Sequence, residues 1–324
     1  MAEINRVNAR MWSMLGARGT FGLAMLELAA KYDFTVLSAD LCESSGLAKF
    51  RDNYSSRFYN VGIAEQDLIG VAAGIASEGQ NVFSTSFAPF ITARCLDQIR
   101  MNLAYMKMNV KLVGLSSGYE QGNSGYSHYG LEDAGILNCI PDITIVTPAD
   151  CSEIYQCVEA AMTYEGPMYI RLTGGRFTPP VYTGDYTFTI GKGIPLAEGT
   201  DTVIFTCGTP TAYAMKAAKV LNKEGLSVSV VNMHTLRPFD TALAEEYCRK
   251  FGTVFTAEEH SCKNGLGTAV AELIAEKGLG CRLVKIAAPD RYEKAGSYDF
   301  MMKNTGLTPD AISDRIRKEL SAEG

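Results

Sequence analysis

Short apolar runs that fit β-strands alternate along this chain with longer stretches that fit helices. Apolar runs at 34–39 and 110–115 follow predicted helices near 19–31 and 89–106. Strands that alternate with helices in this way are typical of parallel sheets covered by helices. The pattern therefore predicts an α/β protein.

The alternation stops between Arg176 and Gly199 and then resumes. This segment holds two adjacent prolines, repeated Thr and Tyr and several glycines, which predicts a crossing linker with short extended pieces. Beyond it, strands are predicted at 202–206, 227–231 and 254–257, with helices at 210–223, near 240–250 and at 309–320. We therefore predict two domains with mainly parallel sheets, residues 1–185 and 186–324, which also suits a length of 324 residues.

Composition and charge narrow the class of protein. About 47% of the residues are hydrophobic and the formal net charge is -6, whereas nucleic-acid binders usually carry a basic face. No apolar stretch approaches the ~18 residues of a membrane span, and the start lacks the pattern of a signal peptide. We expect no nucleic-acid or membrane partner and a cytoplasmic location. The nine cysteines form no Cys-x-x-Cys pair and are expected to be reduced, mostly buried thiols.

One acidic side chain, Glu65, stands after an apolar strand-like run and at the start of a helix rich in small residues. Downstream, Phe87 and Phe90 follow another apolar run, and an acid beside an aromatic shelf suits a flat, nitrogen-containing ring. Each feature has a plainer explanation, because acids in a first helical turn are favoured by ~0.3–1 kcal/mol and paired phenylalanines are common in cores. The order of the features carries more information than either alone.

That order resembles the pyrimidine-binding half of the transketolase family of thiamine diphosphate enzymes. The matching motifs are Gly-Ile-Ala-Glu-Gln at 62–66, Ser-Thr-Ser-Phe-Ala-Pro-Phe at 84–90 and Asp-Gln-Ile-Arg at 97–100, and the likeness continues to nearly the last residue. It implies that Glu65 hydrogen-bonds the N1′ atom of the cofactor pyrimidine, which stacks on Phe87 and Phe90. Apolar neighbours, Ile63 among them, are expected to favour a carboxyl that shares its proton.

The polar, glycine-rich segment 116–133 is long enough to predict a functional loop. By the resemblance, its only histidine, His128, contacts the donor sugar near the reacting carbon; the alternative is a surface histidine without a role. The other two histidines, His234 and His260, lie in the second domain and are expected to be structural or at a subunit interface.

The positions that hold a sugar phosphate in the family are only half matched. Arg18 and Ser44 agree with the family, whereas Ser116 stands where a histidine is expected and Gly174 where an arginine is expected. Two arginines close to Gly174, at 171 and 176, could substitute for it.

A further departure lies in the loop, where Ser124 replaces an aspartate that reads a donor hydroxyl. These changes predict that the chemistry is kept while the substrate differs from the usual pentose and hexose phosphates. Arg171, Arg176, Ser116 and Ser124 are thus candidate substrate contacts, together with Arg18 and Ser44.

The chain lacks the Gly-Asp-Gly motif with which the family holds the diphosphate and Mg²⁺. The resemblance therefore implies a C-terminal subunit without metal ligands of its own. An N-terminal diphosphate-binding subunit would complete the site, in an α₂β₂ assembly that transfers a two-carbon ketol unit from a ketose to an aldose. The small residues at 70–76 fit either a subunit interface or packing within the domain.

Two other functions compete with ketol transfer. One is the β subunit of a 2-oxoacid decarboxylating or deoxyxylulose-phosphate synthase-like enzyme. Two features favour ketol transfer instead: His128 stands in a Gly-x-Ser-His setting, and Phe90 stands where the synthases usually have arginine. The other is a non-catalytic partner subunit, which the missing phosphate residues support and the retained Glu65 opposes.

Overall fold

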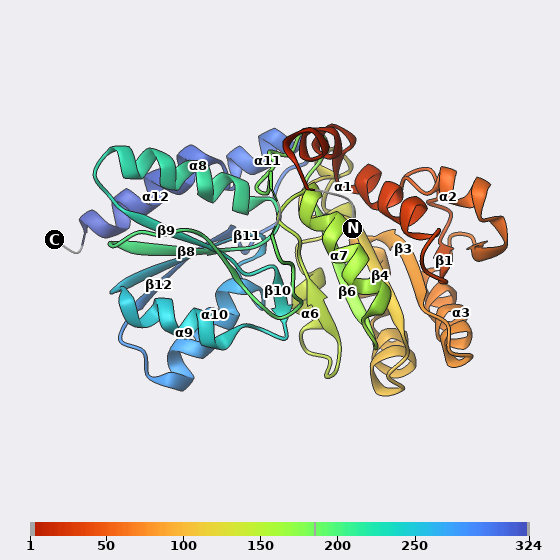
Figure 1. Cartoon of the computed structure of the whole chain (residues 1–324). Helices are drawn as coiled ribbons and strands as arrows, with labels where there is room; N and C mark the ends of the chain where they lie inside the picture. Colours follow the sequence, from red (N-terminus) through yellow and green to blue (C-terminus); the bar gives the residue numbers. More distant parts are fainter. Residues whose placement is uncertain (1–3, 185, 323–324) are drawn as a thin grey trace.

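The computed structural model describes residues 4–184 and 186–322. They form two sheets side by side, each covered by helices (Figure 1). The first sheet has seven strands in the order β10-β5-β6-β4-β3-β1-β2. Six of them are mutually parallel, and β10, from the second half of the chain, pairs antiparallel with β5 at the edge. The strands are β1 (Thr35–Ser38), β2 (Phe58–Asn60), β3 (Val82–Phe87), β4 (Val110–Ser117), β5 (Thr144–Val146), β6 (Met168–Thr173) and β10 (Thr235–Arg237).

Helices cover both faces of this sheet (Figure 1). The longest, α1 (Arg6–Leu28), is broken at Gly16, whose φ of 77° is not helical. The α-helices that follow are α2 (Ala48–Asn53), α3 (Glu65–Ser77), α4 (Ala88–Ile91), α5 (Leu96–Gln98), α6 (Asp133–Leu137) and α7 (Cys151–Thr163). Short 3₁₀-helices are η1 (Ser55–Arg57), η2 (Ala93–Cys95), η4 (Gly122–Ser124) and η5 (Tyr126–His128), and η3 (Ile99–Tyr105) is a π-helix.

The second sheet has five strands in the order β12-β11-β8-β9-β7, with only β7 antiparallel. Its strands are β7 (Ile194–Ala197), β8 (Thr202–Thr206), β9 (Val228–Asn232), β11 (Thr253–Ser261) and β12 (Arg282–Ala288). Its helices are α8 (Pro210–Lys223), α9 (Thr241–Lys250), α10 (Leu266–Lys277), α11 (Tyr298–Asn304) and α12 (Pro309–Ser321). The predicted α/β class with mainly parallel sheets is confirmed.

A single predicted helix at 89–106 is wrong. The segment is instead α4, η2, α5 and the π-helix η3, because Thr92 adopts φ -111° and ψ -80° and its Oγ1 donates to the carbonyl of Ala88 at 2.6 Å. Local bonds of this kind compete with the helical ladder. The break lets the chain turn directly after Phe90.

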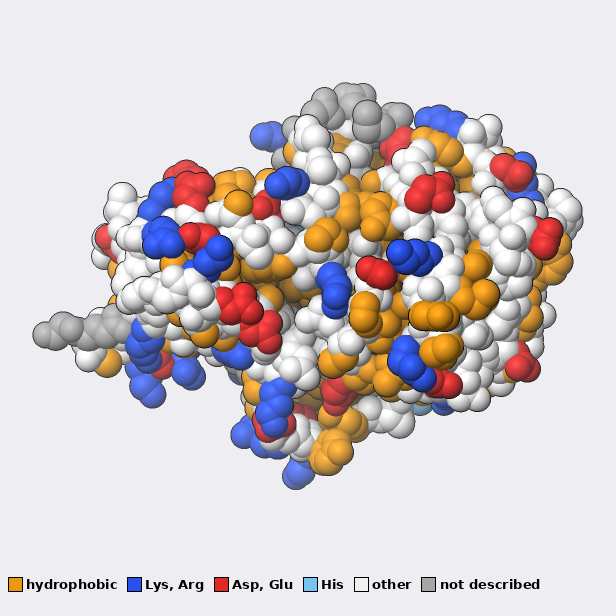
Figure 2. All heavy atoms as spheres, turned by 90° about the horizontal axis from the view of Figure 1, so that it is seen from below, with side chains coloured by type: hydrophobic (Ala, Val, Ile, Leu, Met, Phe, Trp, Pro, Cys, Tyr) orange, Lys and Arg blue, Asp and Glu red, His pale blue; other side chains and the backbone are white. Residues whose placement is uncertain are grey.

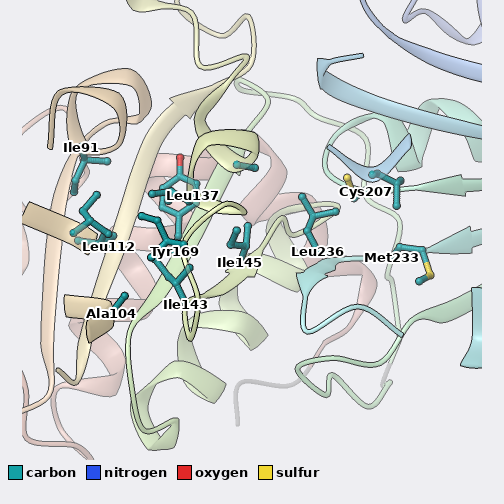
Figure 3. Close-up of a cluster of buried hydrophobic side chains, with 14 of the residues drawn as sticks. Ile91, Ala104, Leu112, Leu137, Ile143, Ile145, Tyr169, Cys207, Met233 and Leu236 are labelled. Atoms are coloured by element: carbon teal, nitrogen blue, oxygen red, sulfur yellow. The ribbon is translucent and has the colours of Figure 1, made fainter. Parts of the chain in front are cut away.

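Apolar and polar contacts join the two domains. Ile145 and Tyr169 of the first sheet lie in one buried cluster with Cys207, Met233 and Leu236 of the second half (Figure 3). The predicted boundary at 185/186 falls at residue 185, which lies outside the described residues. Because β10 completes the first sheet, that boundary does not separate the residues of the two sheets.

Six of the nine cysteines are buried and all nine are free thiols. No helix in the described residues has the length and apolar character needed to cross a membrane.

Candidate active site

The topology brings several predicted site residues to the side of the first sheet at which its parallel strands end. Strands β1, β3, β4 and β6 are neighbours and parallel, so their carboxyl ends lie together. The segments that follow these ends carry Ser44, Phe87, Phe90, His128 and Arg176. Ligands of open α/β sheets bind in crevices at this edge.

Glu65 is the first residue of α3 and is buried, with 3% of its surface exposed. Its Oε1 accepts a hydrogen bond from Ser86 Oγ at 3.2 Å, and its Oε2 accepts one from Arg94 Nη1 at 2.7 Å. A buried carboxylate is costly unless such partners compensate it. In this chain without a cofactor, Arg94 is therefore the cation that compensates the buried carboxylate of Glu65.

Arg94 also stacks on an aromatic ring. Its guanidinium carbon lies 4.1 Å from the centroid of Phe90, while its Nη1 holds Glu65. These are the two contacts that the resemblance assigns to a pyrimidine ring. A ring bound in that place would have to displace the Arg94 side chain, which is 45% exposed and so has solvent to move into.

Sequence reasoning did not identify Arg94. The available signal was a lone cation four residues after Phe90, close to a segment that had to turn back towards Glu65. The break at Thr92 determines where this cation lies, and the helical pattern of 89–106 concealed that break.

His128 packs against the aromatic shelf. Its ring centroid lies 5.2 Å from that of Phe90 and 6.1 Å from that of Phe87, both edge to face. Its Nδ1 is 3.0 Å from Ser127 Oγ. The loop therefore brings His128 to the two phenylalanines, with the ring only partly buried, and its contact with a donor sugar remains a prediction.

The apolar cover expected around Glu65 is incomplete within this chain. Ile69 is buried, but Ile63 is 78% exposed and points away from the core. The expectation that Ile63 shields Glu65 is not met by the chain alone. A contact of Ile63 with a cofactor remains a prediction.

Besides the site formed by Glu65, Phe90 and Arg94, a pocket of about 240 Å³, the second pocket, lies at the carboxyl ends of the same strands. Arg18, Ser44, Glu120 and Arg176 line it. Arg18 Nη1 donates to the carbonyl of Ser44 at 3.1 Å, and Arg18 Nε lies 3.2 Å from Glu120 Oε1. Three predicted residues are thus brought together, and Glu120 joins them without having been anticipated.

Arg171 has a structural role instead of the predicted substrate contact. It is 2% exposed; its Nε donates to both carboxylate oxygens of Asp133 at 2.9 and 2.8 Å. Its Nη2 donates to the carbonyls of Gly130 and Glu259 at 2.6 and 2.8 Å. Because these donors are engaged in joining the two domains, we do not retain Arg171 as a substrate contact.

Gly174 shows why the expected arginine is missing. Its φ is 79°, and a Cβ there would lie 2.5 Å from Thr209 Oγ1 and 2.6 Å from Thr178 Oγ1. A side chain would be both strained and obstructed. Of the two arginines named as substitutes, only the exposed Arg176 reaches the pocket.

The two loop serines occupy different environments. Ser116 is fully buried with φ 54° and accepts a hydrogen bond from Gln121 Nε2 at 3.3 Å. Ser124 is exposed, at the end of η4. No hydrogen bond of the Ser124 side chain ties it to the other site residues in the part of the chain that the structure describes, so its substrate contact remains a prediction.

The histidines of the second domain are buried. His234 stacks on Phe188 with ring centroids 4.4 Å apart, and burial lowers its pKa to about 4. His260 Nε2 accepts from the backbone N–H of Gly135 at 3.1 Å, which ties the domains together. These positions agree with the structural alternative. Within the described ranges, no group of three or more His, Cys, Asp or Glu could hold a metal ion.

The residues present fit the pyrimidine end of thiamine diphosphate. The donor set is a buried acid with a hydroxyl partner, beside an aromatic face that already holds one flat, nitrogen-rich group, the guanidinium of Arg94. Stacking of this kind contributes ~0.5–1.5 kcal/mol beyond the burial of area.

Comparison with known proteins agrees with this geometry. A family model described as the transketolase pyrimidine-binding domain matches residues 14–178, and one described as the transketolase C-terminal domain matches residues 191–312. A Methanocaldococcus jannaschii protein, provisionally named a transketolase C-terminal section, is 38% identical over 95% of this chain and 97% of its own. One subunit of the apulose-4-phosphate transketolase of Phocaeicola vulgatus is 33% identical over 93% of this chain and 96% of its own.

A solved structure supports the same relationship. A split-gene transketolase, described as an inactive β4 tetramer, superposes with a TM-score of 0.84 at 36% identity. The match covers 94% of this chain and 98% of the other. Both domains and their order are therefore shared along nearly the whole length.

Proposed function

This chain belongs to the transketolase family, and from that premise we propose that it is the C-terminal subunit of a two-chain, thiamine diphosphate-dependent transketolase. The reaction would move a two-carbon ketol unit from a ketose donor to an aldose acceptor. The observation that supports the proposal is that buried Glu65 and Phe90 both contact Arg94, while His128 packs against Phe90.

Glu65 would bind and orient the cofactor. Thiamine diphosphate, when bound, supplies a carbanion that adds to the ketose carbonyl. Glu65 would hold a proton shared with the pyrimidine N1′, with Ser86 fixing its other oxygen at 3.2 Å. Removal of Arg94 from the face of Phe90 would open the stacking position, and Phe87 would close its side.

His128 would act on the sugar. It is partly exposed and packs edge to face with Phe90, with ring centroids 5.2 Å apart, so it lies next to the proposed stacking position. A neutral or charged imidazole there can donate a hydrogen bond to a donor hydroxyl or oxyanion. The Gly-x-Ser-His setting of His128, together with Phe90 in the aromatic shelf, supports ketol transfer over the 2-oxoacid alternative.

A separate N-terminal subunit would hold the diphosphate and Mg²⁺. Large apolar side chains of this chain are exposed, among them Ile63, Val71, Met101, Tyr105 and Met106. Figure 2 shows one face on which apolar side chains gather between charged ones. Such surfaces often mark protein interfaces, and Ile63 is two residues from Glu65. We propose an α₂β₂ assembly located in the cytoplasm, with each cofactor between two kinds of subunit.

The substrate would be an uncommon sugar. Only Arg18, Ser44 and Arg176 of the predicted phosphate contacts line the second pocket, and Arg18 is paired with Glu120. The Phocaeicola relative is named for apulose 4-phosphate, which agrees with substrates that vary among subunits of this type. The non-catalytic alternative is less well supported, because Glu65 and Phe90 share a contact with Arg94 and His128 packs against Phe90.

Calorimetry of the assembled protein tests the proposal. Thiamine diphosphate and Mg²⁺ should bind to a mixture of this chain with a diphosphate-domain transketolase subunit, and should not bind to this chain alone. The mixture should then transfer ketol units from at least one member of a panel of free and phosphorylated ketoses. Cofactor binding without transfer from any donor would support the non-catalytic alternative, and tight cofactor binding by the chain alone would contradict a shared site.

A further inference from the structure

Glu120 is an unusual side chain in the second pocket. It is 10% exposed, and its Oε1 lies 3.2 Å from Arg18 Nε. Its other carboxylate oxygen, Oε2, is buried and makes no well-formed hydrogen bond among residues 4–184 and 186–322, although the Ser116 hydroxyl lies close to the carboxylate. Burial raises the pKa of Glu120, and the charge of Arg18 and the Ser116 hydroxyl oppose that rise. Buried acceptors are nearly always paired, so an incompletely paired one beside a pocket can accept a hydrogen bond from a ligand.

The pocket and His128 are built from neighbouring segments of the chain. Glu120 and His128 belong to the same loop after β4, and Ser44 and Arg176 follow β1 and β6 at the same sheet edge. His128 marks the aromatic shelf, so the pocket at Glu120 would receive the end of the donor away from the transferred carbons.

The charges of the pocket oppose a phosphate. Two arginines, 18 and 176, and two glutamates, 43 and 120, line the pocket, so it has no net positive charge. Arg18 Nε is paired with Glu120, and Arg18 Nη1 donates to the Ser44 carbonyl at 3.1 Å. A phosphate dianion would lie against the Glu120 carboxylate and would compete with it for Arg18. A hydroxyl group, by contrast, can donate to Oε2 and accept from a remaining N–H of Arg18 or from the exposed Arg176.

We propose that Glu120 is a specificity-determining residue that selects a ketose donor with an uncharged, hydroxyl-bearing end and rejects the phosphorylated form. This inference rests on the proposed ketol transfer, and it assigns the substrate class of that same site. Rejection would come from charge repulsion, and selection from pairing of the incompletely paired Oε2.

The test compares one ketose with its phosphate ester, fructose and fructose 6-phosphate, in the assembled enzyme with a common aldose acceptor. The unsubstituted enzyme should have the higher kcat/KM for fructose. Glu120→Gln should shift the ratio of the two kcat/KM values towards the ester by about 10- to 100-fold, because it removes the negative charge and keeps the shape. The melting temperature of the variant confirms that it is folded.

A matched control is Glu132→Gln, in the same loop but hydrogen-bonded to Tyr126 outside the pocket. It removes the same charge and should leave the ratio within about threefold. A preference of the unsubstituted enzyme for the ester, or an unchanged ratio in Glu120→Gln, would overturn the inference.

A binding measurement separates this inference from the proposed function. Inorganic phosphate should bind at least tenfold more tightly to the Glu120→Gln assembly than to the unsubstituted one, as measured by calorimetry. If neither sugar is a donor but phosphate affinity rises as expected, the proposed ketol transfer fails with these donors while the role of Glu120 in excluding phosphate stands. If phosphate affinity is equal in the two assemblies, the role of Glu120 is refuted whatever the activity.

Discussion

At the scale of single residues, Glu65 is the side chain on which the chemistry depends most. Glu65→Gln keeps the size of the side chain, but it leaves one acceptor oxygen for Ser86 and Arg94 and removes the ability to share a proton with N1′. We expect kcat to fall by ~10²–10⁴, as for the loss of one proton-transfer group, with the subunits still assembled. Steady-state kinetics and size-exclusion chromatography measure the two effects.

The control for this variant is Glu78→Gln, at the far end of the same helix and exposed. It should leave kcat unchanged. Full activity in Glu65→Gln would remove Glu65 from the mechanism.

We expect Arg94 to stabilise the isolated chain and to lower its affinity for the cofactor. Its ion pair with Glu65 and its stacking on Phe90 must both be given up when a pyrimidine ring enters. A partly exposed pair contributes ~0.2–1 kcal/mol and a cation–π contact ~0.5–1 kcal/mol, which together correspond to about tenfold in affinity. Arg94→Met should therefore bind thiamine diphosphate about tenfold more tightly in calorimetry of the assembly.

The same substitution should lower the melting temperature of the isolated chain, because Glu65 loses its cation while buried. Arg100→Met, an exposed arginine paired with Asp97, should change neither quantity. Weaker cofactor binding in Arg94→Met would mean that Arg94 stays on Glu65 when the cofactor is present.

At the scale of elements, close approach of α1 to the loop after β1 holds Arg18 beside Ser44. Gly22 of α1 faces the backbone of Gly46, and a Cβ at Gly22 would collide with the Gly46 carbonyl. Gly22→Ala should destabilise the chain by ~1–3 kcal/mol, as overpacking does, and should also disturb the second pocket. Urea unfolding measures the loss.

Gly252→Ala provides the comparison, since a Cβ there meets nothing within 4 Å. Its free energy of unfolding should stay within ~0.5 kcal/mol of the unsubstituted chain. Equal stability of the two variants would mean that α1 shifts without cost.

Elements with simple periodicity could be predicted from the sequence. The helix at 210–223 agrees with α8, and the strands at 202–206 and 110–115 agree with β8 and most of β4. Helix breaks could not be predicted, because the break at Thr92 depends on a side-chain bond to Ala88 and that at Gly16 on one backbone angle.

The candidate site was predictable to the extent that it depends on matched positions. Phe90 and His128 pack together and Glu65 reaches Phe90 through Arg94, whereas Arg94 and the other partners that complete the charges do not follow from one sequence. Arg171 and Arg176 look equivalent along the chain, yet one lies inside a β-strand facing Asp133 and the other is exposed. The small residues at 70–76 also divide: Ala72, Ala73 and Ala76 are buried, and a Cβ at Gly70 or Gly74 would meet no atom within 4 Å.

At the scale of the whole molecule, buried carboxyl groups between the domains predict how stability depends on pH. Glu153 of α7 accepts two hydrogen bonds from Asn232 of β9, and burial raises its pKa to about 8. Glu259 of β11 accepts from the Tyr119 N–H at 2.6 Å, and burial raises its pKa to about 7.

The folded chain keeps these protons at pH values where the unfolded chain has lost them, since an unfolded glutamate has a pKa near 4.3. The contribution of these groups to the free energy of unfolding should therefore fall as pH rises from about 4.5 to about 8, and level off above. Glu153→Gln stays neutral and should flatten that decline by an amount of the order of a few kcal/mol.

Urea unfolding at pH 5.5, 6.5 and 8 would measure the slope. Glu246→Gln, on the exposed face of α9, should keep the slope of the unsubstituted chain. A slope unchanged in Glu153→Gln would show that Glu153 is ionised in the fold throughout this range.

The antiparallel pairing of β10 with β5 means that the two halves of the chain cannot be separated at the linker without breaking the first sheet. Thr235 and Arg237 pair with Val146 and Ile145, and the carbonyl of His234 accepts from the Thr147 N–H at 2.7 Å. A fragment that stops at the linker would expose the bare rim of β5, and such rims recruit other chains into aggregates. A chimera that exchanges the C-terminal half for that of a relative must therefore transplant both strands as a matched pair.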